Sequence, residues 1–167
     1  MLWYIGTFLK ALPAYIANMT PVLLSKFNIL GLRRPIDGGR IAWDGNRWLG
    51  DGKTWQGLLS APVAGALAGF LLSFWGFSTP FTGFILGVGA ILGDISGSFI
   101  KRRLGMPRGA NAGLLDSLDF ITFALILSYP LIQWSGDEVV LLLVATPVLH
   151  RLANVMGYKL RLKREPW

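Results

Sequence analysis

Residues 79–103 read TPFTGFILGVGAILGDISGSFIKRR, an apolar run that ends in three consecutive basic residues. Its apolar part, about 79–100, is close to the ~20 residues that a helix needs to cross ~30 Å of hydrocarbon. Further apolar segments of similar length follow the same pattern, at about 3–25, 55–75, 114–134 and 139–159. The sequence therefore predicts an all-α integral membrane protein with about five transmembrane helices, in a single domain over residues 1–167.

The composition agrees with this class. Of the 167 residues, 53% are hydrophobic, nine are acidic and none is cysteine, and the net charge is +7. A soluble domain of this size would expose far too much apolar surface. The absence of cysteine excludes disulfides, thiolate catalysis and cysteine-bound metals. The positive charge does not indicate nucleic acid, because the basic residues cluster at the ends of the apolar runs.

The same basic residues predict the orientation in the membrane. They lie in the connections at about 26–54 and 101–113 and in the tail, whereas the connections near 76–80 and 135–138 contain no Lys or Arg. By the positive-inside rule, the N-terminus lies outside and the C-terminus lies in the cytoplasm. We therefore expect a multi-pass protein of the plasma membrane with a long cytoplasmic loop between its first two helices.

The first apolar segment is unusual because it contains Lys10, Pro13, Asn18 and Pro21. A signal peptide is the alternative, but the apolar run is too long and lacks a small-residue cleavage site. We expect a kinked membrane helix. Glycines recur at four-residue spacing in the second and third segments, which lets helix backbones approach closely and predicts tight packing. These glycines are Gly65, Gly69, Gly83, Gly87, Gly89, Gly93 and Gly97.

The stretch GDGKT at residues 50–54 looks like the end of a nucleotide-binding phosphate loop. Such a loop needs a glycine five positions before the Gly-Lys pair, within a strand–loop–helix unit, but Arg47 stands there and no buried strand precedes it. Topology instead places Lys53 and Thr54 at the start of the second helix. A helix N-terminus offers free N–H groups to an anion, and Gly52 permits close backbone approach. We expect Gly52, Lys53 and Thr54 to bind an anion.

Three aspartates are candidates for chemistry. Asp94 lies inside the third apolar run, where an ionised carboxylate costs a few kcal/mol and requires a partner. Asp116 and Asp119 share one face at the start of the fourth segment. If the third and fourth helices form an antiparallel hairpin, the three carboxylates meet, and such an oxygen-rich set favours Mg²⁺. The alternatives are an internal ion pair for Asp94 and helix capping for the other two.

Polar and basic residues accompany the aspartates. Helical spacing places Ser98, Lys101 and Arg102 on the face of Asp94, an arrangement suited to phosphoryl or nucleotidyl transfer. Simple anchoring of a helix end is the alternative for each cation, and for Arg103 it is the favoured one. In the fifth segment, Arg151 beside His150 could bind a lipid phosphate, with snorkelling as the alternative for Arg151.

The run GDISGSFIKRRLGMPRGANAGLLDSLDF at 93–120 resembles the signature of the CDP-diacylglycerol synthases, which are membrane cytidylyltransferases. The matching positions are Ser98, Lys101, Arg102, Gly113, Asp116 and Asp119. The chain lacks that family's Lys-Asp and His-Gly-Gly elements. RPIDGGR at 34–40, DGNRWLGDGKTWQG at 44–57, LPAYIANMTPVL at 12–23 and the short length are similar instead to the smaller, archaeal CDP-archaeol synthase family.

This resemblance implies a Mg²⁺-dependent transfer of CMP from CTP to the phosphate of an unsaturated archaeal ether lipid, with release of pyrophosphate. It implies that the three aspartates hold Mg²⁺, with Lys101 also catalytic, and that the loop at about 28–52 closes over CTP. The bilayer and the lipid are the other partners, nucleic acid is not one, and a homodimer is compatible. The residues expected to bind the nucleotide are Gly52, Lys53, Thr54, Ser98, Arg102 and Asn111, and those for the lipid phosphate are Arg151 and His150.

Two rival functions make different demands on the sequence. A CDP-alcohol phosphotransferase requires a glycine directly after the first pair of aspartates, but Phe120 follows Asp119. A small transporter would carry ions past Asp94. Against that reading, the acidic residues gather at one membrane face, and no polar track reaches the other face.

Overall fold

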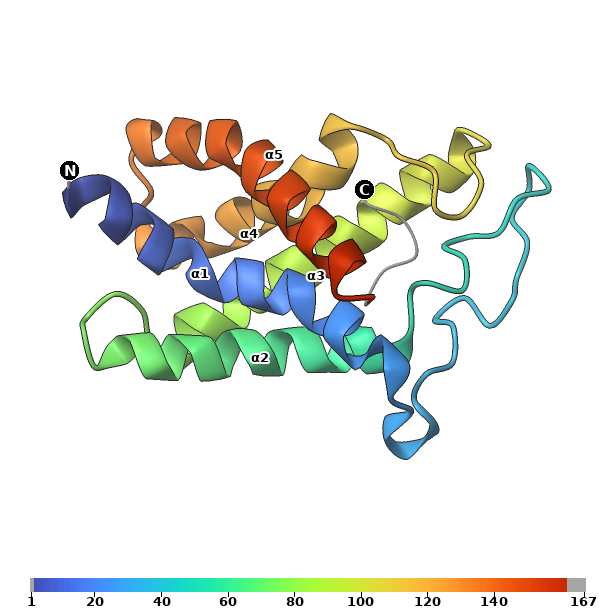
Figure 1. Cartoon of the computed structure of the whole chain (residues 1–167), viewed down its shortest axis with the longest axis horizontal. Coiled ribbons are helices and arrows are strands. Elements are labelled where there is room, and N and C mark those ends of the chain that lie inside the picture. Colours follow the sequence, from blue (N-terminus) through green and yellow to red (C-terminus); the bar gives the residue numbers. More distant parts are fainter. Residues whose placement is uncertain (1, 162–167) are drawn as a thin grey trace.

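The structure is a computed structural model that describes residues 2–161. It contains the helices α1 (Leu2–Leu23), α2 (Trp55–Ser73), α3 (Pro80–Arg103), α4 (Leu114–Ile132) and α5 (Gly136–Lys159) (Figure 1). Two 3₁₀ turns, Leu24–Lys26 and Ile29–Gly31, follow α1. The only strand-like pairings in the described part are isolated bridges, Pro35 with Thr54 and Ile41 with Arg47. The all-α prediction is confirmed.

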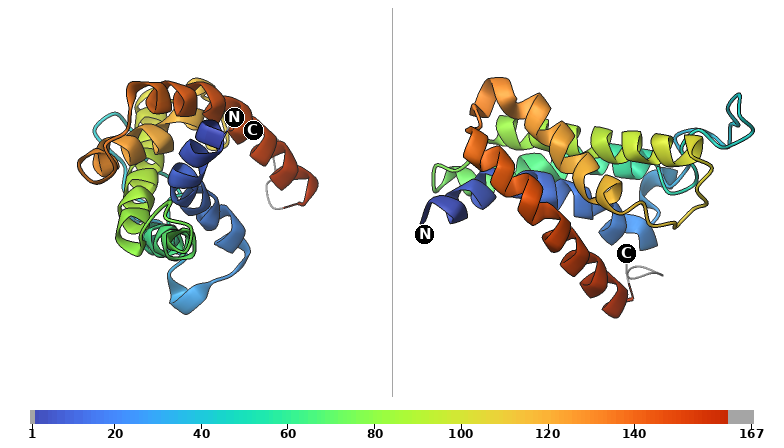
Figure 2. Two further views of the ribbon diagram at one scale, coloured as in Figure 1. Left: turned by 90° about the vertical axis from the view of Figure 1, so that its left-hand side faces the viewer. Right: turned by 90° about the horizontal axis from the view of Figure 1, so that it is seen from above.

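Within the described residues, α2, α3, α4 and α5 are long and apolar enough to cross a membrane. Helix α1 is not among them, because Lys10 and Asn18 interrupt its apolar run. It packs along α2 and α3, as Figures 1 and 2 show, and it buries small side chains such as Ala14 there. The protein is thus a multi-pass membrane protein. That α1 also spans, and the orientation of the bundle, stay predictions.

Glycines join α2 to α3 as their spacing predicts. A methyl group added at Gly65 would collide with the backbone of Gly83 and Gly87, and one added at Gly69 would collide with that of Thr79 and Gly83. Neither helix could therefore carry larger residues at these positions without moving apart. The two helix backbones lie in direct contact, which is how small residues stabilise helix pairs in membranes.

Helices α3 and α4 form the predicted antiparallel hairpin. Gly89 faces Ala124, and Gly93 faces the backbone of Asp119 and Phe120, so later positions of α3 meet earlier positions of α4. The core around this hairpin contains large, fully buried side chains. They are Leu86, Phe120, Ile121 and Leu142.

Helix α5 is attached mainly through its first half. Its buried residues are Glu138, Leu142 and Thr146, and the second half leans away from the other helices (Figure 2). Residue Thr146 also bonds Tyr15 of α1, with 2.6 Å between the two hydroxyl oxygens. Lys163 and Arg164, which contribute to the predicted cytoplasmic tail, lie outside the described residues.

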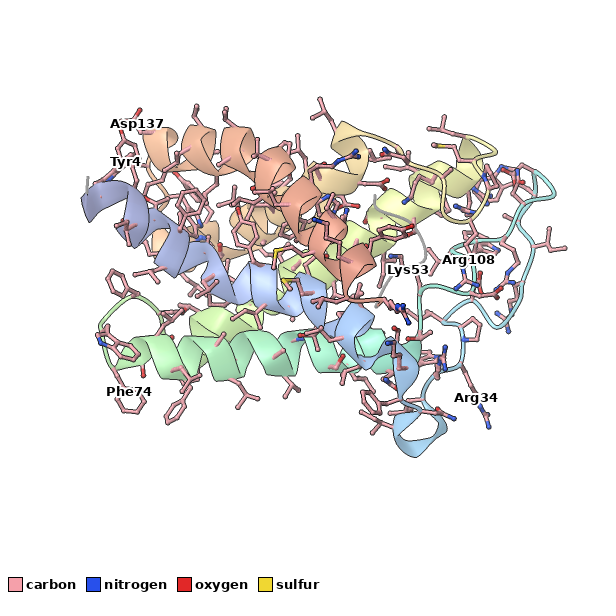
Figure 3. The ribbon with its side chains drawn as sticks, viewed as in Figure 1. Tyr4, Arg34, Lys53, Phe74, Arg108 and Asp137 are labelled. Atoms are coloured by element: carbon pink, nitrogen blue, oxygen red, sulfur yellow. The ribbon has the colours of Figure 1, made fainter. Side chains whose placement is uncertain are left out.

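The two ends of the bundle differ in chemistry. Arg34, Lys53 and Arg108 lie at one end and Tyr4, Phe74 and Asp137 at the other (Figure 3). The first of these, which we name the loop end, carries the connections 27–54 and 104–113. This agrees with the sorting of basic residues in the sequence.

Candidate active site

Asp94 is paired with Lys53 at the loop end. The Lys53 Nζ lies 2.6 Å from Asp94 Oδ2, and both side chains are mostly covered. Lys53 precedes α2, whereas Asp94 stands in α3, so the pair joins two segments that are distant in the chain. The ion pair considered for Asp94 is therefore present, and its partner is the lysine of the GDGKT stretch.

A second lysine pairs with Asp116. The Lys101 Nζ lies 2.5 Å from Asp116 Oδ1, while Asp116 Oδ2 accepts a hydrogen bond of 2.8 Å from the N–H of Ala112. Asp116 thus ties the end of α3 and the 104–113 connection to the first turn of α4. Asp116 therefore accepts a local hydrogen bond near the start of α4 and also makes an ion pair with α3 across the hairpin.

Asp119 follows Asp116 by three residues on α4. Its Oδ1 accepts from the N–H of Phe120 at 2.6 Å, and its Oδ2 packs against Gly97, where no side chain intervenes. The charges of Asp94 and Asp116 act on it repulsively and that of Lys53 attractively. Among residues 2–161, Asp119 is the one of the three aspartates without an ion-pair partner.

The three carboxylates have the right chemistry for a hard divalent cation, because Mg²⁺ prefers oxygen ligands. In the described part of the chain, however, no three acidic or histidine side chains are gathered closely enough to hold a metal ion. The ammonium groups of Lys53 and Lys101 occupy oxygens that a metal would need. Binding of Mg²⁺ to the three aspartates therefore requires these lysines to move, and it stays a prediction.

The first N–H groups of α2 were expected to be free to bind an anion, but in the structure they are hydrogen-bonded. The N–H of Trp55 donates to Arg34 O, that of Gln56 to Leu32 O, and that of Gly57 to the Thr54 hydroxyl. This part of the prediction is wrong, because the preceding segment folds back and supplies carbonyl oxygens to the first turn. Thr54 is the N-cap of α2, so the ammonium of Lys53 is what this stretch offers to an anion.

Other expected nucleotide contacts also lie at the loop end. Ser98 is buried, and the Asn111 side chain accepts from the N–H of Gly113 at 2.8 Å. Arg102 donates from Nη2 to Pro107 O at 3.3 Å, and its buried Nε has no partner among residues 2–161. Binding of a nucleotide by Arg102 stays a prediction.

The two residues expected to bind the lipid phosphate stand apart from this group. The His150 ring lies 6.4 Å from that of Phe120, and its Nδ1 lies 3.3 Å from Asn154 Nδ2. Arg151 is exposed on the part of α5 that leans outward. Neither residue contacts Asp94, Asp116 or Asp119 through a hydrogen bond or ion pair in the described chain.

The loop 36–51 contains a polar core that sequence reasoning missed. The side chain of Asp37 is 2% exposed and accepts from Arg47 Nη2 at 2.6 Å and from the N–H groups of Leu49 and Gly50. Burial raises the pKa of Asp37, but these hydrogen bonds outweigh it and hold the pKa well below its usual range. Asp37 and Arg47 are opposite charges in a glycine-rich loop, and this was the only signal in the sequence. The loop has no helical or strand period from which their contact could be predicted.

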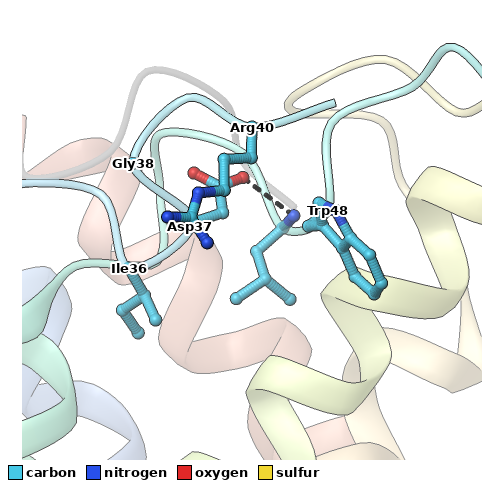
Figure 4. Close-up of a pocket in the computed structure, with 6 residues that line it drawn as sticks. Ile36, Asp37, Gly38, Arg40 and Trp48 are labelled. Atoms are coloured by element: carbon cyan, nitrogen blue, oxygen red, sulfur yellow. Dashed lines mark hydrogen bonds between the residues drawn. The ribbon is translucent and has the colours of Figure 1, made fainter. Parts of the chain in front are cut away.

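The structure contains two hollows of interest. A cavity of about 430 Å³ is lined by loop residues including Asp37, Arg40 and Trp48 (Figure 4). Another lining residue, Ile36, donates its backbone N–H to Lys53 O at 2.8 Å. A second hollow of about 320 Å³ lies between α3 and α4 and is mainly apolar. Its lining is Ser96, Gly97, Ile100, Leu114, Leu115, Leu118, Asp119, Thr122 and Phe123.

Comparison with known proteins identifies the family. The model of the CarS-like CDP-archaeol synthase family matches residues 1–167. The chain belongs to the CDP-archaeol synthase family. It is 46% identical to the CDP-archaeol synthase of Thermococcus gammatolerans, over 99% of this chain and 94% of the relative. It is 44% identical to that of Pyrococcus abyssi, over 99% and 95% of the two chains.

A solved structure supports the same conclusion. It is described as an intramembrane enzyme for archaeal membrane lipid biosynthesis, and it shares 43% sequence identity and a TM-score of 0.77 with this chain. The likeness covers 89% of this chain and 92% of the other. The predicted resemblance is confirmed, and the phosphotransferase and transporter readings are set aside.

Proposed function

We propose that the loop end is the centre at which CMP passes from CTP to the phosphate of an unsaturated archaeal ether lipid, with release of pyrophosphate. As a member of its family, the protein is a membrane cytidylyltransferase that forms CDP-archaeol in archaeal lipid biosynthesis. The observation that carries the site is the α3–α4 hairpin. It brings Asp94, Asp116 and Asp119 to one end of the bundle together with Lys53 and Lys101.

The reaction needs positioned charge and no side-chain nucleophile. An oxygen of the lipid phosphate attacks the α-phosphorus of CTP, and the bond from that phosphorus to the leaving pyrophosphate breaks. A strong general base is unnecessary, since the lipid phosphate is already anionic. Lys53, Lys101 and Arg102 would hold the triphosphate. Asp94, Asp116 and Asp119 would hold Mg²⁺ once the lysines have moved, and the ion would then supply neutralising charge for the phosphoryl oxygens.

Two ion pairs bear on how the site would take up the nucleotide. Lys53 is paired with Asp94 and Lys101 with Asp116, and each lysine would turn toward a phosphate when CTP binds. Gly52, Ser98 and Asn111 are proposed as further nucleotide contacts, with Thr54 fixing the start of α2 behind Lys53. The loop cavity beside Lys53 would receive the nucleoside.

The lipid would approach from the membrane. The apolar hollow between α3 and α4 reaches Asp119 and suits a hydrocarbon chain, while Arg151 and His150 would meet the lipid phosphate from α5. The active site would face the cytoplasm from the plasma membrane. One chain supplies all of these groups, and dimerisation stays a prediction.

The test is an assay of the purified protein in detergent with radiolabelled CTP, Mg²⁺ and an ether-lipid phosphate. The wild type should form a CDP-lipid, and Asp119→Asn should lower the rate by roughly a hundredfold or more. Asp137→Asn makes the same change at the other end of the bundle and should keep the wild-type rate. Normal turnover by folded Asp119→Asn would remove that residue from the site, and absence of any CDP-lipid would refute the reaction.

A further inference from the structure

Arg103, the last residue of α3, is bound into the loop 36–51. Its Nη1 lies 2.9 Å from Asp44 Oδ1, and its Nη2 donates to the backbone oxygen of Arg47 at 2.6 Å. Its side chain is 17% exposed. Three rings lie 5.1–5.9 Å from its guanidinium carbon, and they belong to Trp43, Trp48 and Phe99. The expectation that Arg103 merely anchors a helix end is wrong.

Arginine can make all of these contacts at the same time, whereas lysine cannot. The planar guanidinium donates in two directions within one plane while aromatic rings cover its faces. A residue that only anchored α3 at the membrane surface would turn its charge to water or to lipid headgroups. Arg103 is turned instead toward one segment of its own chain, the loop 36–51.

A continuous set of hydrogen bonds leads from Arg103 to Lys53. Arg47, whose carbonyl Arg103 binds, donates through Nη2 and Nε to Asp37 at 2.6 and 3.2 Å. The other contacts of Asp37 fix the turn at residues 49–50, and the adjacent Ile36 is bonded to the carbonyl of Lys53 at 2.8 Å. The loop is therefore stiff between its contact with Arg103 and Lys53.

Two ion pairs join this segment to α3, and Trp48 also stacks on Phe99 of α3, with 5.8 Å between the ring centroids. Arg103 binds the segment at the end of the helix, and Asp94 binds Lys53 nine residues earlier, about 13 Å along the axis at 1.5 Å per residue. Ser98 and Lys101 lie on α3 between these two points. The place of Lys53 relative to α3 thus depends on these contacts.

We infer that Arg103 is a positioning residue for CTP: it holds the loop 36–51 on the end of α3 and thereby sets the place of Lys53. This inference rests on the proposed function, in which Lys53 meets the triphosphate. Loss of Arg103 leaves the aspartates in place, but Lys53 is then no longer held in a fixed position relative to α3. The loss therefore weakens nucleotide binding more than it slows the chemical step.

Steady-state kinetics test the inference. Arg103→Leu should raise the KM for CTP about tenfold or more and change kcat by less than about threefold, since hydrogen bonds to a charged group are lost from binding. Arg103→Lys should recover only part of the loss, because it restores the charge and not the planar fork. Arg108→Gln removes an exposed arginine five residues later and should leave both constants unchanged.

Limited proteolysis tests the contact without substrate. Trypsin should cleave after the exposed Arg40 several times faster in Arg103→Leu than in the wild type, while cleavage after Arg33, outside the held segment, stays constant. This readout separates the two proposals. If the wild type formed no CDP-lipid, the proposed reaction would fail, and the proteolysis would still decide whether Arg103 holds the loop.

Asp44→Asn gives a second route if Arg103→Leu does not fold. It removes the carboxylate partner of Arg103 and leaves α3 unchanged, so it should shift the KM for CTP and the cleavage rate in the same direction by a smaller factor. A wild-type KM for CTP in folded Arg103→Leu would overturn the inference. So would wild-type cleavage after Arg40, or a fall in kcat with KM unchanged.

Discussion

Lysine–carboxylate ion pairs join helices or loops at the loop end of the bundle and also away from it. The two groups of pairs differ in how many hydrogen bonds each carboxylate accepts. Away from the loop end, Lys10 of α1 lies 2.7 Å from Glu138 of α5. The side chain of Glu138 is 6% exposed and also accepts from the Thr7 hydroxyl at 3.3 Å and from Ser135 N–H at 3.1 Å. Three donors therefore share the two buried oxygens of Glu138.

At the loop end the carboxylates are less fully bonded. Asp94 accepts only from Lys53 among residues 2–161, and its side chain is 29% exposed. Asp116 accepts from Lys101 and from one backbone N–H. A carboxylate with all its bonds made stabilises a fold, whereas one with unused capacity can exchange its lysine for another cation. We propose that this difference in bonding separates a structural pair, that of Glu138, from a functional one, that of Asp94.

Removing the lysine of each pair gives the largest contrast. Lys53→Met should lower CDP-lipid formation by roughly a hundredfold, because a cation on the triphosphate is lost, and should lower stability less than loss of Lys10 does, because Asp94 is more exposed than Glu138. Lys10→Met should lower the free energy of unfolding by about 2 kcal/mol, since it leaves Glu138 buried without its partner. The activity assay and denaturation in detergent measure both effects. Equal losses of activity in the two folded variants would erase the distinction.

Neutralising both partners sharpens the same comparison. Lys10→Met with Glu138→Gln should recover most of the stability lost in the single variant, because no charge then stays unpaired. Lys53→Met with Asp94→Asn should recover no activity, since both members act on ligands. The unfolding free energies and turnover of the single and double variants test this. Recovery of activity in the second double variant would mean that Lys53 and Asp94 serve only each other.

Asp119, which has no lysine, can be moved without altering its charge. A methyl group at Gly97 would meet the Asp119 carboxylate, so Gly97→Ala should displace it and lower kcat by about tenfold or more. At Gly93 a methyl group meets the backbone of Asp119 and Phe120 instead, and Gly93→Ala should mainly reduce stability. Gly136→Ala, which enters open space, is the control. Unchanged kcat in Gly97→Ala would show that the exact place of Asp119 is unimportant.

Much of the fold could be predicted because hydrocarbon thickness and helix rise fix the length of an apolar run. The segments expected at about 55–75 and 114–134 became α2, Trp55–Ser73, and α4, Leu114–Ile132. The end of α3 and the start of α5 were missed by three residues. Helix α3 continues to Arg103, through the three basic residues that were assigned to the connection, and α5 begins at Gly136 because Ser135 and Glu138 form a capping box.

The candidate site was predictable where it depends on helical spacing and less so elsewhere. Asp94, Asp116 and Asp119 could be placed at one end because a hairpin of two regular helices brings them there. The partner of Asp94 could not be identified, because Lys53 reaches it from an irregular segment. The occupied N–H groups of α2 and the role of Arg103 depend on the path of the same loop, which has no repeating period.

Asp37 extends the comparison to the loop, since it resembles Glu138 in making all its bonds within the protein. Its pKa is held below the usual range by Arg47 and backbone N–H groups, against the effect of burial. A depressed pKa contributes stability that is complete above the unfolded pKa and is lost as the pH falls through the folded pKa.

Hydrogen exchange of the Leu49 and Gly50 amides, corrected for the intrinsic effect of pH, should therefore stay slow down to about pH 4 and quicken only below it. Asp37→Asn should expose these amides even at neutral pH, whereas Asp51→Asn, at an exposed pair, should not. If protection in the wild type were lost already well above pH 4, the ionised Asp37 carboxylate would not be what holds these amides, and its likeness to Glu138 would fail.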